Sequence, residues 1–174
     1  MSDFNIRRLE ADKQRPTFDC GDTDLNEFYA VDSIHNAQNL LSVTYVVERD
    51  SEVIAFFSLS NDSIRKEKLK QDMLERVAQA VRLKQKSYAS LPAVKIGRLA
   101  TSSNTQGQGV GSEIIDYIKF WFTTGNKTGC RFIVVDAYNN PKTINFYEKN
   151  DFSFLQHSDA NKNTRLMFFD LKMI

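Results

Sequence analysis

A short glycine-rich stretch between a strand and a helix constrains the fold of this chain more than any other feature. Residues 94–101 (VKIGRLAT) are typical of a strand, and a polar connection follows them that contains Gln106-Gly-Gln-Gly-Val-Gly111-Ser112. Apolar side chains then recur at helical spacing: Ile114, Ile115, Ile118, Trp121 and Phe122. Glycines at the start of a helix leave backbone N–H groups open to an anion, so this connection predicts a phosphate- or pyrophosphate-binding loop.

The loop matches neither of the two best-known nucleotide motifs. It lacks the Gly-Lys-Ser/Thr ending of a P-loop, and Gly107-x-Gly109 is followed by Ser112 where a dinucleotide fingerprint has a third glycine. A glycine-rich connection that binds no ligand is the alternative that the loop alone leaves open.

The rest of the chain alternates predicted strands and helices. We expect strands at residues 4–9, 42–48, 53–60, 94–101, 132–135, 152–156 and 166–171. We expect helices at 24–39, with Asp24 as N-cap, at 64–86, from the glycine loop to about 122, and at 141–149. Pro92 should close the loop after the second helix. This order predicts one mixed sheet with helices on its faces, in a single domain spanning 1–174.

Composition narrows the class of protein. The chain has 174 residues, among them 13 Phe, 6 Tyr and 1 Trp, which is enough bulky apolar volume for a core and excludes a disordered chain. Two cysteines, Cys20 and Cys130, and two isolated histidines exclude a disulfide scaffold and argue against a metal site. No signal peptide or membrane-spanning run is visible, so we expect a soluble, cytoplasmic protein without membrane contact.

Two motifs at a characteristic separation resemble the GCN5-related N-acetyltransferase (GNAT) family. Gln106-x-x-Gly109-x-Gly111 resembles the loop that binds the pyrophosphate of acetyl-CoA in that family. After the next strand, the stretch NPKTINFYEKNDF (140–152) resembles its second signature in order and spacing. Thr143 stands where the family usually has Ala, and Asp151 where it usually has Gly. Position 151, just past the helix end, usually requires a left-handed backbone, which Asp tolerates better than most residues.

The resemblance implies an acetyl-CoA-dependent N-acetyltransferase that transfers acetyl directly to a primary amine. It also implies the GNAT fold, an α/β (α+β mixed) domain whose mostly antiparallel sheet has about six or seven strands and helices on both faces. Tyr147 would be the catalytic residue, a general acid toward the departing thiolate, with an aromatic packed on the cofactor as the alternative. The implied acetyl-CoA-binding residues are Leu99, Ala100, Thr101, Gln106, Gly107, Gln108, Gly109, Val110, Gly111, Ser112, Asn140, Thr143, Phe146 and Tyr147.

Shorter motifs resemble one branch of this family. FDCG (18–21), LNEF (25–28) and GRLA (97–100) are similar to sequences in the toxins of bacterial toxin–antitoxin pairs, which acetylate the α-amine of aminoacyl-tRNA. This resemblance implies aminoacyl-tRNA as acceptor, Arg98 as a substrate residue and a small antitoxin protein as partner, with the chain a monomer or homodimer. The alternatives are acetylation of a small-molecule amine or a protein N-terminus, and a non-catalytic acyl-CoA-binding sensor.

The chemistry of amines also bears on the acceptor. A lysine ε-amine, with a pKa of about 10.4, needs a base at neutral pH, whereas an α-amine with a pKa near 8 is substantially neutral without help. The strand 94–101 carries no Asp or Glu. The sequence therefore favours an α-amine acceptor, although a base from another element stays open.

The net charge of +1 conceals a basic segment. Residues 64–86 hold eight basic and three acidic side chains, among them Lys66, Lys68 and Lys70. The segment could be the wet face of an amphipathic helix or a surface that contacts tRNA phosphates. We therefore take the three lysines as candidate substrate residues.

Overall fold

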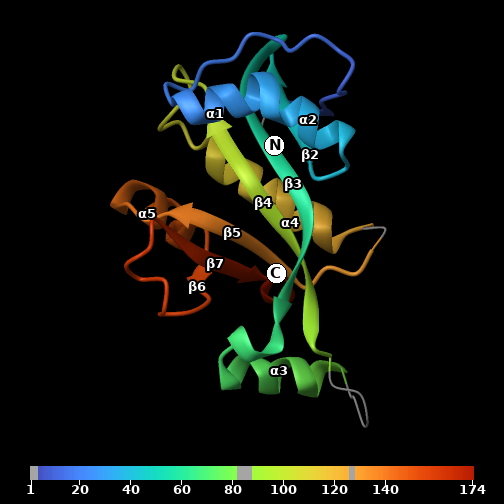
Figure 1. Ribbon diagram of the computed structural model, residues 1–174, viewed down its shortest axis with the longest axis vertical. Coiled ribbons are helices and arrows are strands. Elements are labelled where there is room, and N and C mark those ends of the chain that lie inside the picture. The colour runs from blue at the N-terminus through green and yellow to red at the C-terminus, as the bar shows by residue number, and fades with distance from the viewer. Residues whose placement is uncertain (1–3, 82–87, 126–127) are drawn as a thin grey trace. The chain divides into compact units, whose positions relative to one another are not determined.

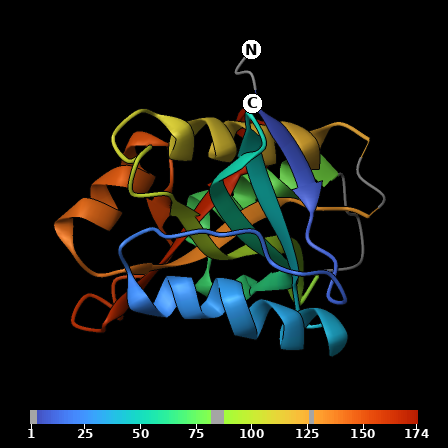
Figure 2. The ribbon, with the colours of Figure 1, turned by 90° about the horizontal axis from the view of Figure 1, so that it is seen from above.

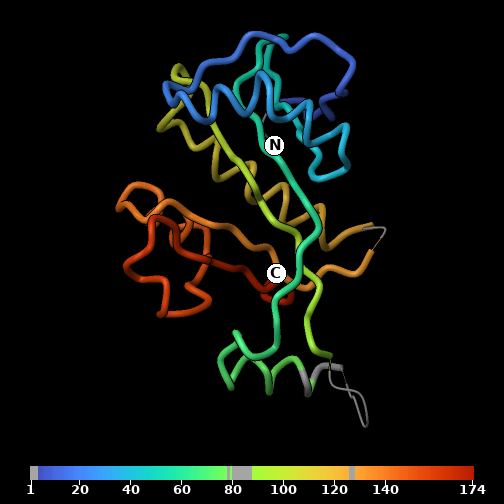
Figure 3. The backbone as a smooth tube through the Cα atoms, in the orientation of Figure 1, coloured from blue at the N-terminus to red at the C-terminus, as the bar shows by residue number. Residues whose placement is uncertain are grey.

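The computed structural model describes residues 4–81, 88–125 and 128–174 (Figures 1 and 3). Seven strands form one sheet in the order β1-β2-β3-β4-β5-β7-β6. The register shows antiparallel pairing of β1 with β2, β2 with β3, β5 with β7 and β6 with β7. The prediction of a mixed, mostly antiparallel sheet of six or seven strands with helices is confirmed.

The strands and helices have the following bounds in the described chain. The strands are β1 (Asn5–Arg8), β2 (Val43–Arg49), β3 (Glu52–Arg65), β4 (Ser90–Thr101), β5 (Phe132–Tyr138), β6 (Ser153–Phe154) and β7 (Thr164–Asp170). The α-helices are α1 (Thr23–Glu27), α2 (Ser33–Gln38), α3 (Gln71–Val81), α4 (Val110–Thr123) and α5 (Pro141–Lys149). A π-helical turn, η1 (Phe28–Asp32), joins α1 to α2, and the segments η2 (Lys66–Lys68) and η3 (Leu171–Met173) are 3-10 turns.

The chain divides into two compact units. The first comprises Met1–Ser60 and Ile96–Phe120, and the second Asn61–Lys95 and Trp121–Ile174. The long strands β3 and β4 each contribute residues to both units, and so does helix α4.

The core of the first unit is built around Phe56 on β3. Its ring contacts those of Phe18, Phe28 and Tyr29, with centroids 5.2, 6.1 and 5.2 Å away. Val46, opposite Phe56 on β2, belongs to the same buried cluster. These aromatics come from the N-terminal segment and the first helices, so the cluster holds α1 and η1 against the strands.

The strands of the first unit are covered on both faces. Adjacent residues of a strand point to opposite faces, yet Val46 and Val47, and likewise Ala55, Phe56 and Phe57, are all fully buried. Figure 2 shows α1, η1 and α2 on one side of β2 and β3 and α4 on the other. The predicted apolar stripe of α4 is confirmed, because Ile114, Ile115 and Ile118 are completely buried.

A separate core holds the second unit together. Ile64 near the end of β3, Leu69 before α3 and Val77 on α3 are buried in one cluster with residues of β4 and β5. β5 pairs with β7 along its whole length, from Phe132 opposite Asp170 to Tyr138 opposite Thr164.

The structure corrects the predicted start of the first helix. The N-cap is Asp22, whose side chain accepts a hydrogen bond from Leu25 N at 3.0 Å, and Asp24 lies in the first turn instead. Both aspartates are suitable caps by residue type, and the cap used is Asp22, which directly follows the left-handed Gly21 with φ of +77°. The predicted end near Asn39 is confirmed, since α2 ends at Gln38.

The predicted helix over 64–86 is wrong at its start. β3 continues to Arg65, η2 follows, and α3 begins only at Gln71. Lys66 N donates to Ala89 O at 3.0 Å, which extends the pairing of the two long strands beyond the polar residues Asn61–Ser63. The predicted end falls at 82–86, outside the described residues.

Pro92 is also misplaced by the prediction, because it lies inside β4 rather than in a loop. Its carbonyl accepts a hydrogen bond from Arg131 N at 2.9 Å, and its side chain is exposed. A proline is tolerated in a strand where its missing N–H breaks no ladder bond.

Candidate functional site

The glycine loop ends in the N-terminus of helix α4, within the first unit. Gly107 and Gly109 have φ of +79° and +87°, a left-handed backbone that side chains disfavour. Both are exposed, and a Cβ on either would meet no atom within 4 Å, so the backbone conformation rather than lack of space requires glycine. Gly109 O accepts from Glu113 N at 3.1 Å. The amides of Val110 and Gly111 therefore fall in the first helical turn, which provides no intrahelical acceptor.

Hydrogen bonds to β3 hold the segment before the glycines. Ser102 N donates to Ile54 O at 2.8 Å, and Thr105 Oγ1 donates to the same oxygen at 3.1 Å. The hydroxyls of Ser102 and Thr105 are also 2.9 Å apart. The loop consequently starts from a rigid strand.

The side chain of Gln106 faces the N-terminal segment. Its Nε2 donates to Cys20 O at 2.8 Å and to Thr101 O at 3.3 Å. Gln108 Nε2 donates to Asn104 O at 2.8 Å, within the loop. The two predicted glutamines thus lie in the loop, but their amide groups are engaged by protein carbonyls.

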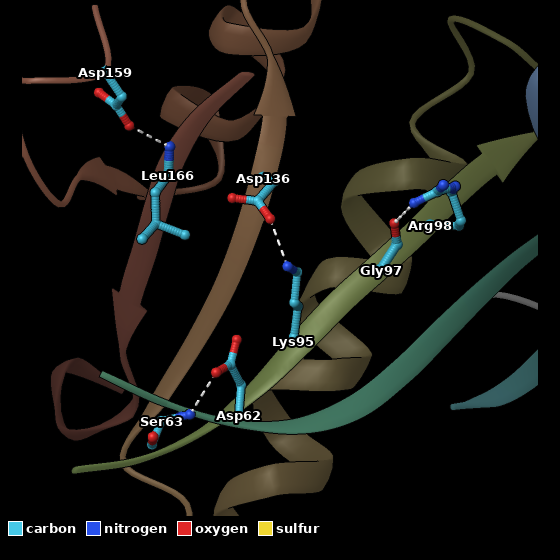
Figure 4. Close-up of polar contacts among 8 residues, drawn as sticks. All are labelled: Asp62, Ser63, Lys95, Gly97, Arg98, Asp136, Asp159 and Leu166. Atoms are coloured by element: carbon cyan, nitrogen blue, oxygen red, sulfur yellow. Dashed lines mark hydrogen bonds and ion pairs between the residues drawn. The ribbon is translucent and has the colours of Figure 1, made fainter. Parts of the chain in front are cut away.

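The end of β4 carries the predicted residues Arg98, Leu99, Ala100 and Thr101. Ala100 is buried in the cluster of Phe28, whereas Arg98 is exposed. The Arg98 guanidinium lies 5.1 Å from the centroid of the Phe28 ring, and its Nη1 donates to Gly97 O at 2.8 Å (Figure 4). A cation above an aromatic ring is held in place while its outer N–H groups face solvent.

In the second unit, Asn140 caps helix α5. Its Oδ1 accepts from Thr143 N at 2.9 Å, and Pro141 occupies the first position of the helix. Asn139 Nδ2 donates to Ala160 O and Lys162 O, both at 2.9 Å. Asn140, predicted as an acetyl-CoA-binding residue, thus caps the helix that carries Tyr147.

Tyr147 lies on the buried side of α5. Its ring packs edge-on against Phe146 and Phe152, with centroids 5.0 and 5.3 Å away. Burial raises the pKa of the Tyr147 hydroxyl well above its usual value, because the phenolate would lose its hydration. The hydroxyl is protonated at neutral pH, as it would also be at the usual tyrosine pKa of about 10.

The end of α5 has the expected left-handed residue. Asp151 has φ of 65° and donates from its amide to Glu148 O at 3.0 Å, while Phe152 N donates to Tyr147 O at 3.0 Å. These bonds form a Schellman cap, which places Phe152 against the tyrosine ring.

An ion pair joins β4 to β5 within the second unit. Lys95 Nζ lies 2.5 Å from Asp136 Oδ2 (Figure 4). The sequence does not reveal this pair, since the two residues lie 41 positions apart. The carboxylate is thus held by the Lys95 ammonium on the neighbouring strand.

The three candidate lysines are exposed, as an RNA contact requires. Lys66 and Lys68 belong to η2 and Lys70 precedes α3, so they do not share one helix face as predicted. Arg65 pairs with Glu67 at 3.7 Å on the same surface. The basic residues Arg82, Lys84 and Lys86 lie outside the described residues.

Neither a metal site nor a membrane-spanning helix is found in residues 4–81, 88–125 and 128–174. No group of three or more His, Cys, Asp or Glu side chains in those ranges could hold a metal ion. No helix within the same ranges is both long and apolar enough to cross a membrane.

Comparison with known proteins decides the family. The acetyltransferase (GNAT) domain matches residues 41–154. The chain belongs to this family. The match includes β4, the glycine loop and helix α5, and it identifies the protein as an acetyltransferase, as predicted.

Solved structures share the fold over almost the whole chain. A structure of AtaT with acetyl-methionyl-tRNAfMet has a TM-score of 0.78 at 23% identity, covering 98% of this chain and 96% of that one. AtaTR bound with acetyl-CoA has 0.76 at 24%, covering 99% and 96%. A Tyr→Phe mutant of KacT has 0.78 at 20%, covering 99% and 97%.

Sequence reasoning missed several residues that support the loop. Asn26 Nδ2 donates to Asp19 Oδ1 at 2.7 Å. Ser103 Oγ, in the same loop as Gln106, donates to Asp19 O at 3.3 Å. The signal was present in FDCG and LNEF, whose Asp and Asn are typical of tight turns before a helix. Neither motif indicates by itself that this turn reaches the glycine loop.

Proposed function

We propose that the protein transfers the acetyl group of acetyl-CoA to the α-amine of aminoacyl-tRNA in the cytoplasm and so acts as a translation-blocking toxin. Membership of the GNAT family supports acetyl transfer as the reaction. The structural likeness to AtaT, which has been solved with acetyl-methionyl-tRNAfMet, supports the choice of acceptor.

The glycine loop fits the pyrophosphate of acetyl-CoA. Amides in the first turn of α4 that lack an intrahelical acceptor can donate to phosphate oxygens, and the positive end of the helix dipole favours the negative charge. The glycines leave the approach to these amides open. Since Gln106 Nε2 binds Cys20 O and its amide donates to Ser102 O at 3.1 Å, we assign Gln106 to holding the loop rather than to contacting the ligand.

Tyr147 supplies a proton to the departing thiolate. The amine nitrogen bonds to the thioester carbonyl carbon, the carbon–sulfur bond breaks, and the sulfur takes the proton of the Tyr147 hydroxyl. The amine proton passes to water, which re-protonates the tyrosine. This hydroxyl is protonated at neutral pH, and Asn140 fixes the helix that carries it.

An α-amine acceptor agrees with the acidic side chains that strands β4 and β5 offer as bases. β4 has no carboxylate, and Asp136 on β5 is paired with Lys95. An α-amine with a pKa near 8 is substantially neutral at neutral pH and does not require a protein base. We assign Arg98 and the exposed Lys66, Lys68 and Lys70 to the phosphates of the RNA, since arginine and lysine are the usual phosphate ligands.

A small antitoxin protein is the partner that we propose for this chain. A structure of an AtaT mutant bound to the C-terminus of the antitoxin AtaR shares the fold at 23% identity and a TM-score of 0.73. A partner of this kind would keep the activity silent until it is removed.

Mass spectrometry of aminoacyl-tRNA tests the proposal directly. Purified protein, acetyl-CoA and total aminoacyl-tRNA should yield N-acetyl-aminoacyl-tRNA. In a Tyr147→Phe variant, turnover should fall by about 10²–10⁴-fold, while acetyl-CoA binding and thermal unfolding remain close to those of the wild type. Tyr88→Phe is the matched control, because it removes the same hydroxyl from an exposed tyrosine.

Different results would contradict different parts of the proposal. Acetylation of free amines or protein N-termini but not of aminoacyl-tRNA would overturn the acceptor. Binding of acetyl-CoA without thiol release on any amine would make the protein a sensor. A Tyr147→Phe variant with more than about half of wild-type turnover would remove Tyr147 from the proton transfer.

A further inference from the structure

The side chain of Asn26 joins the residues before helix α1 into one hydrogen-bonded turn. Its Oδ1 accepts from Cys20 N at 3.0 Å and from the Cys20 thiol at 3.2 Å, and its Nδ2 donates to Asp19 Oδ1 at 2.7 Å. The same Asp19 oxygen accepts from Gly21 N at 2.8 Å. Both polar atoms of the Asn26 side chain are thus used within this turn.

Two carbonyl oxygens of this turn bind the start of the glycine loop. Asp19 O accepts from Ser103 N at 3.0 Å and from Ser103 Oγ at 3.3 Å. Cys20 O accepts from Gln106 Nε2 at 2.8 Å. The direction of both carbonyls depends on the turn that Asn26 closes, although the Asn26 side chain bonds only to Asp19 and Cys20.

The loop is therefore held from two sides. On one side Ile54 O on β3 binds the residues at its start, and on the other the turn before α1 binds Ser103 and Gln106. The same N-terminal segment continues to Phe28, whose ring lies under the guanidinium of Arg98. One short segment thus contacts both the glycine loop and the exposed arginine at the end of β4.

We propose that Asn26 is a positioning residue for acetyl-CoA, which orients the glycine loop through the backbone carbonyls of Asp19 and Cys20. This inference rests on the proposed function, because it takes the loop as the pyrophosphate site. A loop already held in its binding orientation loses less conformational entropy when the ligand binds. Without Asn26, the two carbonyls reorient and the loop amides no longer converge on one anion.

The lowered pKa of Asp19 agrees with this arrangement. Hydrogen bonds from Gly21 N and then from Asn26 stabilise the carboxylate and lower its pKa below the usual value. Both bonds thus favour the ionised carboxylate of Asp19 in the folded chain.

The variant Asn26→Ala tests the proposal, with Asn39→Ala as its matched control. Asn39 is an exposed asparagine just after α2 whose Nδ2 also donates to a backbone carbonyl, His35 O at 2.8 Å. For Asn26→Ala we expect the acetyl-CoA dissociation constant and KM to rise about five- to tenfold, the scale of one or two hydrogen bonds. The kcat at saturating acetyl-CoA should stay within about twofold, and Asn39→Ala should resemble the wild type in both.

Hydrogen exchange supplies a readout that a general loss of stability would not reproduce. Acetyl-CoA should slow amide exchange at Cys20, Gly21 and Ser103 in the wild type and in Asn39→Ala, but not in Asn26→Ala. If Asn26→Ala does not fold, Asn26→Asp keeps the size and the acceptor oxygen, loses the donor to Asp19, and should raise KM in the same way.

The outcomes separate this inference from the proposed function. Wild-type binding by Asn26→Ala, or a fall in kcat with KM unchanged, would overturn the positioning role while leaving the enzyme assignment intact. A wild-type protein that binds no acetyl-CoA would overturn both. A rise in KM for Asn39→Ala equal to that for Asn26→Ala would also overturn the role, because the effect would then not belong to this turn.

Discussion

At the scale of single residues, burial sets the chemistry of the tyrosines. Tyr147 and Tyr29 are both almost completely buried, and in each case loss of hydration raises the pKa of the hydroxyl. Tyr147 is the proton donor that we propose, and its hydroxyl is protonated at neutral pH. For Tyr29, which donates to Pro16 O at 3.0 Å, the consequence is structural.

Tyr29 makes stability depend on pH at the alkaline end. Burial raises its pKa from about 10 to about 12, so between these values the unfolded chain loses a proton that the folded chain keeps. The stabilising contribution is complete below pH 10 and declines as the pH rises toward 12. We therefore expect Tyr29→Phe to lower the free energy of unfolding less at about pH 11 than at about pH 9, measured by urea denaturation.

This pH dependence has an internal control. Between about pH 7 and pH 9 the difference in the free energy of unfolding between the wild type and Tyr29→Phe should stay constant, since Tyr29 is protonated in both the folded and the unfolded chain there. An equal difference at about pH 9 and pH 11 would mean that the hydroxyl is not shielded from water as the structure indicates.

At the scale of elements, two helices end in the same cap with different residues. After α2, Leu40 N donates to Ala37 O at 3.2 Å and Leu41 N to Asn36 O at 2.8 Å, the bonding pattern that also ends α5. Both caps need a left-handed residue, and Leu40 has φ of 57°. Leucine is poorly suited to this conformation, and here its side chain is 91% exposed.

Replacing Leu40 by glycine should stabilise the protein. The change removes left-handed strain of roughly 1–2 kcal/mol, and the greater freedom of glycine in the unfolded chain offsets about 0.5–1 kcal/mol. We expect a net gain of about 0.5–1 kcal/mol in the free energy of unfolding, measured by urea denaturation. The control is Leu41→Gly at a position that is also exposed but not left-handed, which should be neutral or destabilising. A loss of stability in Leu40→Gly would show that the leucine side chain is needed.

At the scale of the whole molecule, near-neutral charge conceals a local excess of positive charge. The chain carries 23 basic and 22 acidic residues, yet Lys66, Lys68 and Lys70 lie exposed at alternate positions of one short segment. A general polycation is thereby excluded, whereas a local contact with RNA phosphates is allowed.

Charge reversal tests that interaction. Replacing Lys66, Lys68 and Lys70 by glutamate should raise KM for aminoacyl-tRNA and flatten its dependence on salt, by about 0.7–0.9 in the log–log slope for each phosphate that the lysines no longer neutralise. KM for acetyl-CoA should not change. The control reverses three other exposed lysines and so makes the same change in net charge: Lys149, Lys162 and Lys172. An equal effect of both triple variants would reduce the interaction to general electrostatics.

Much of the architecture could be predicted because it depends on local patterns. The strand, glycine loop and helix over residues 94–122 follow from apolar spacing and from glycines that only a turn requires. Helix α5, with Asn140 as its cap and Asp151 at its end, is likewise determined by its own residues. These patterns, with the family resemblance, also led to the acetyltransferase that the family match confirms.

Other features depend on partners far along the chain. β3 extends to Arg65 because Lys66 pairs with Ala89, and Pro92 lies in a strand because Arg131 bonds its carbonyl. Charged and proline residues look like loop or helix locally, but a paired neighbour overrides that preference.

The sequence by itself determined the class of fold, the glycine loop and the choice of Tyr147 as candidate proton donor, since backbone conformation and residue type are local properties. Only the tertiary structure decided that Gln106 turns to Cys20, that Asn26 closes the turn beside it and that Asp136 is paired with Lys95. Hydrogen bonds and ion pairs form between atoms within about 3–4 Å, and folding alone brings such distant residues that close.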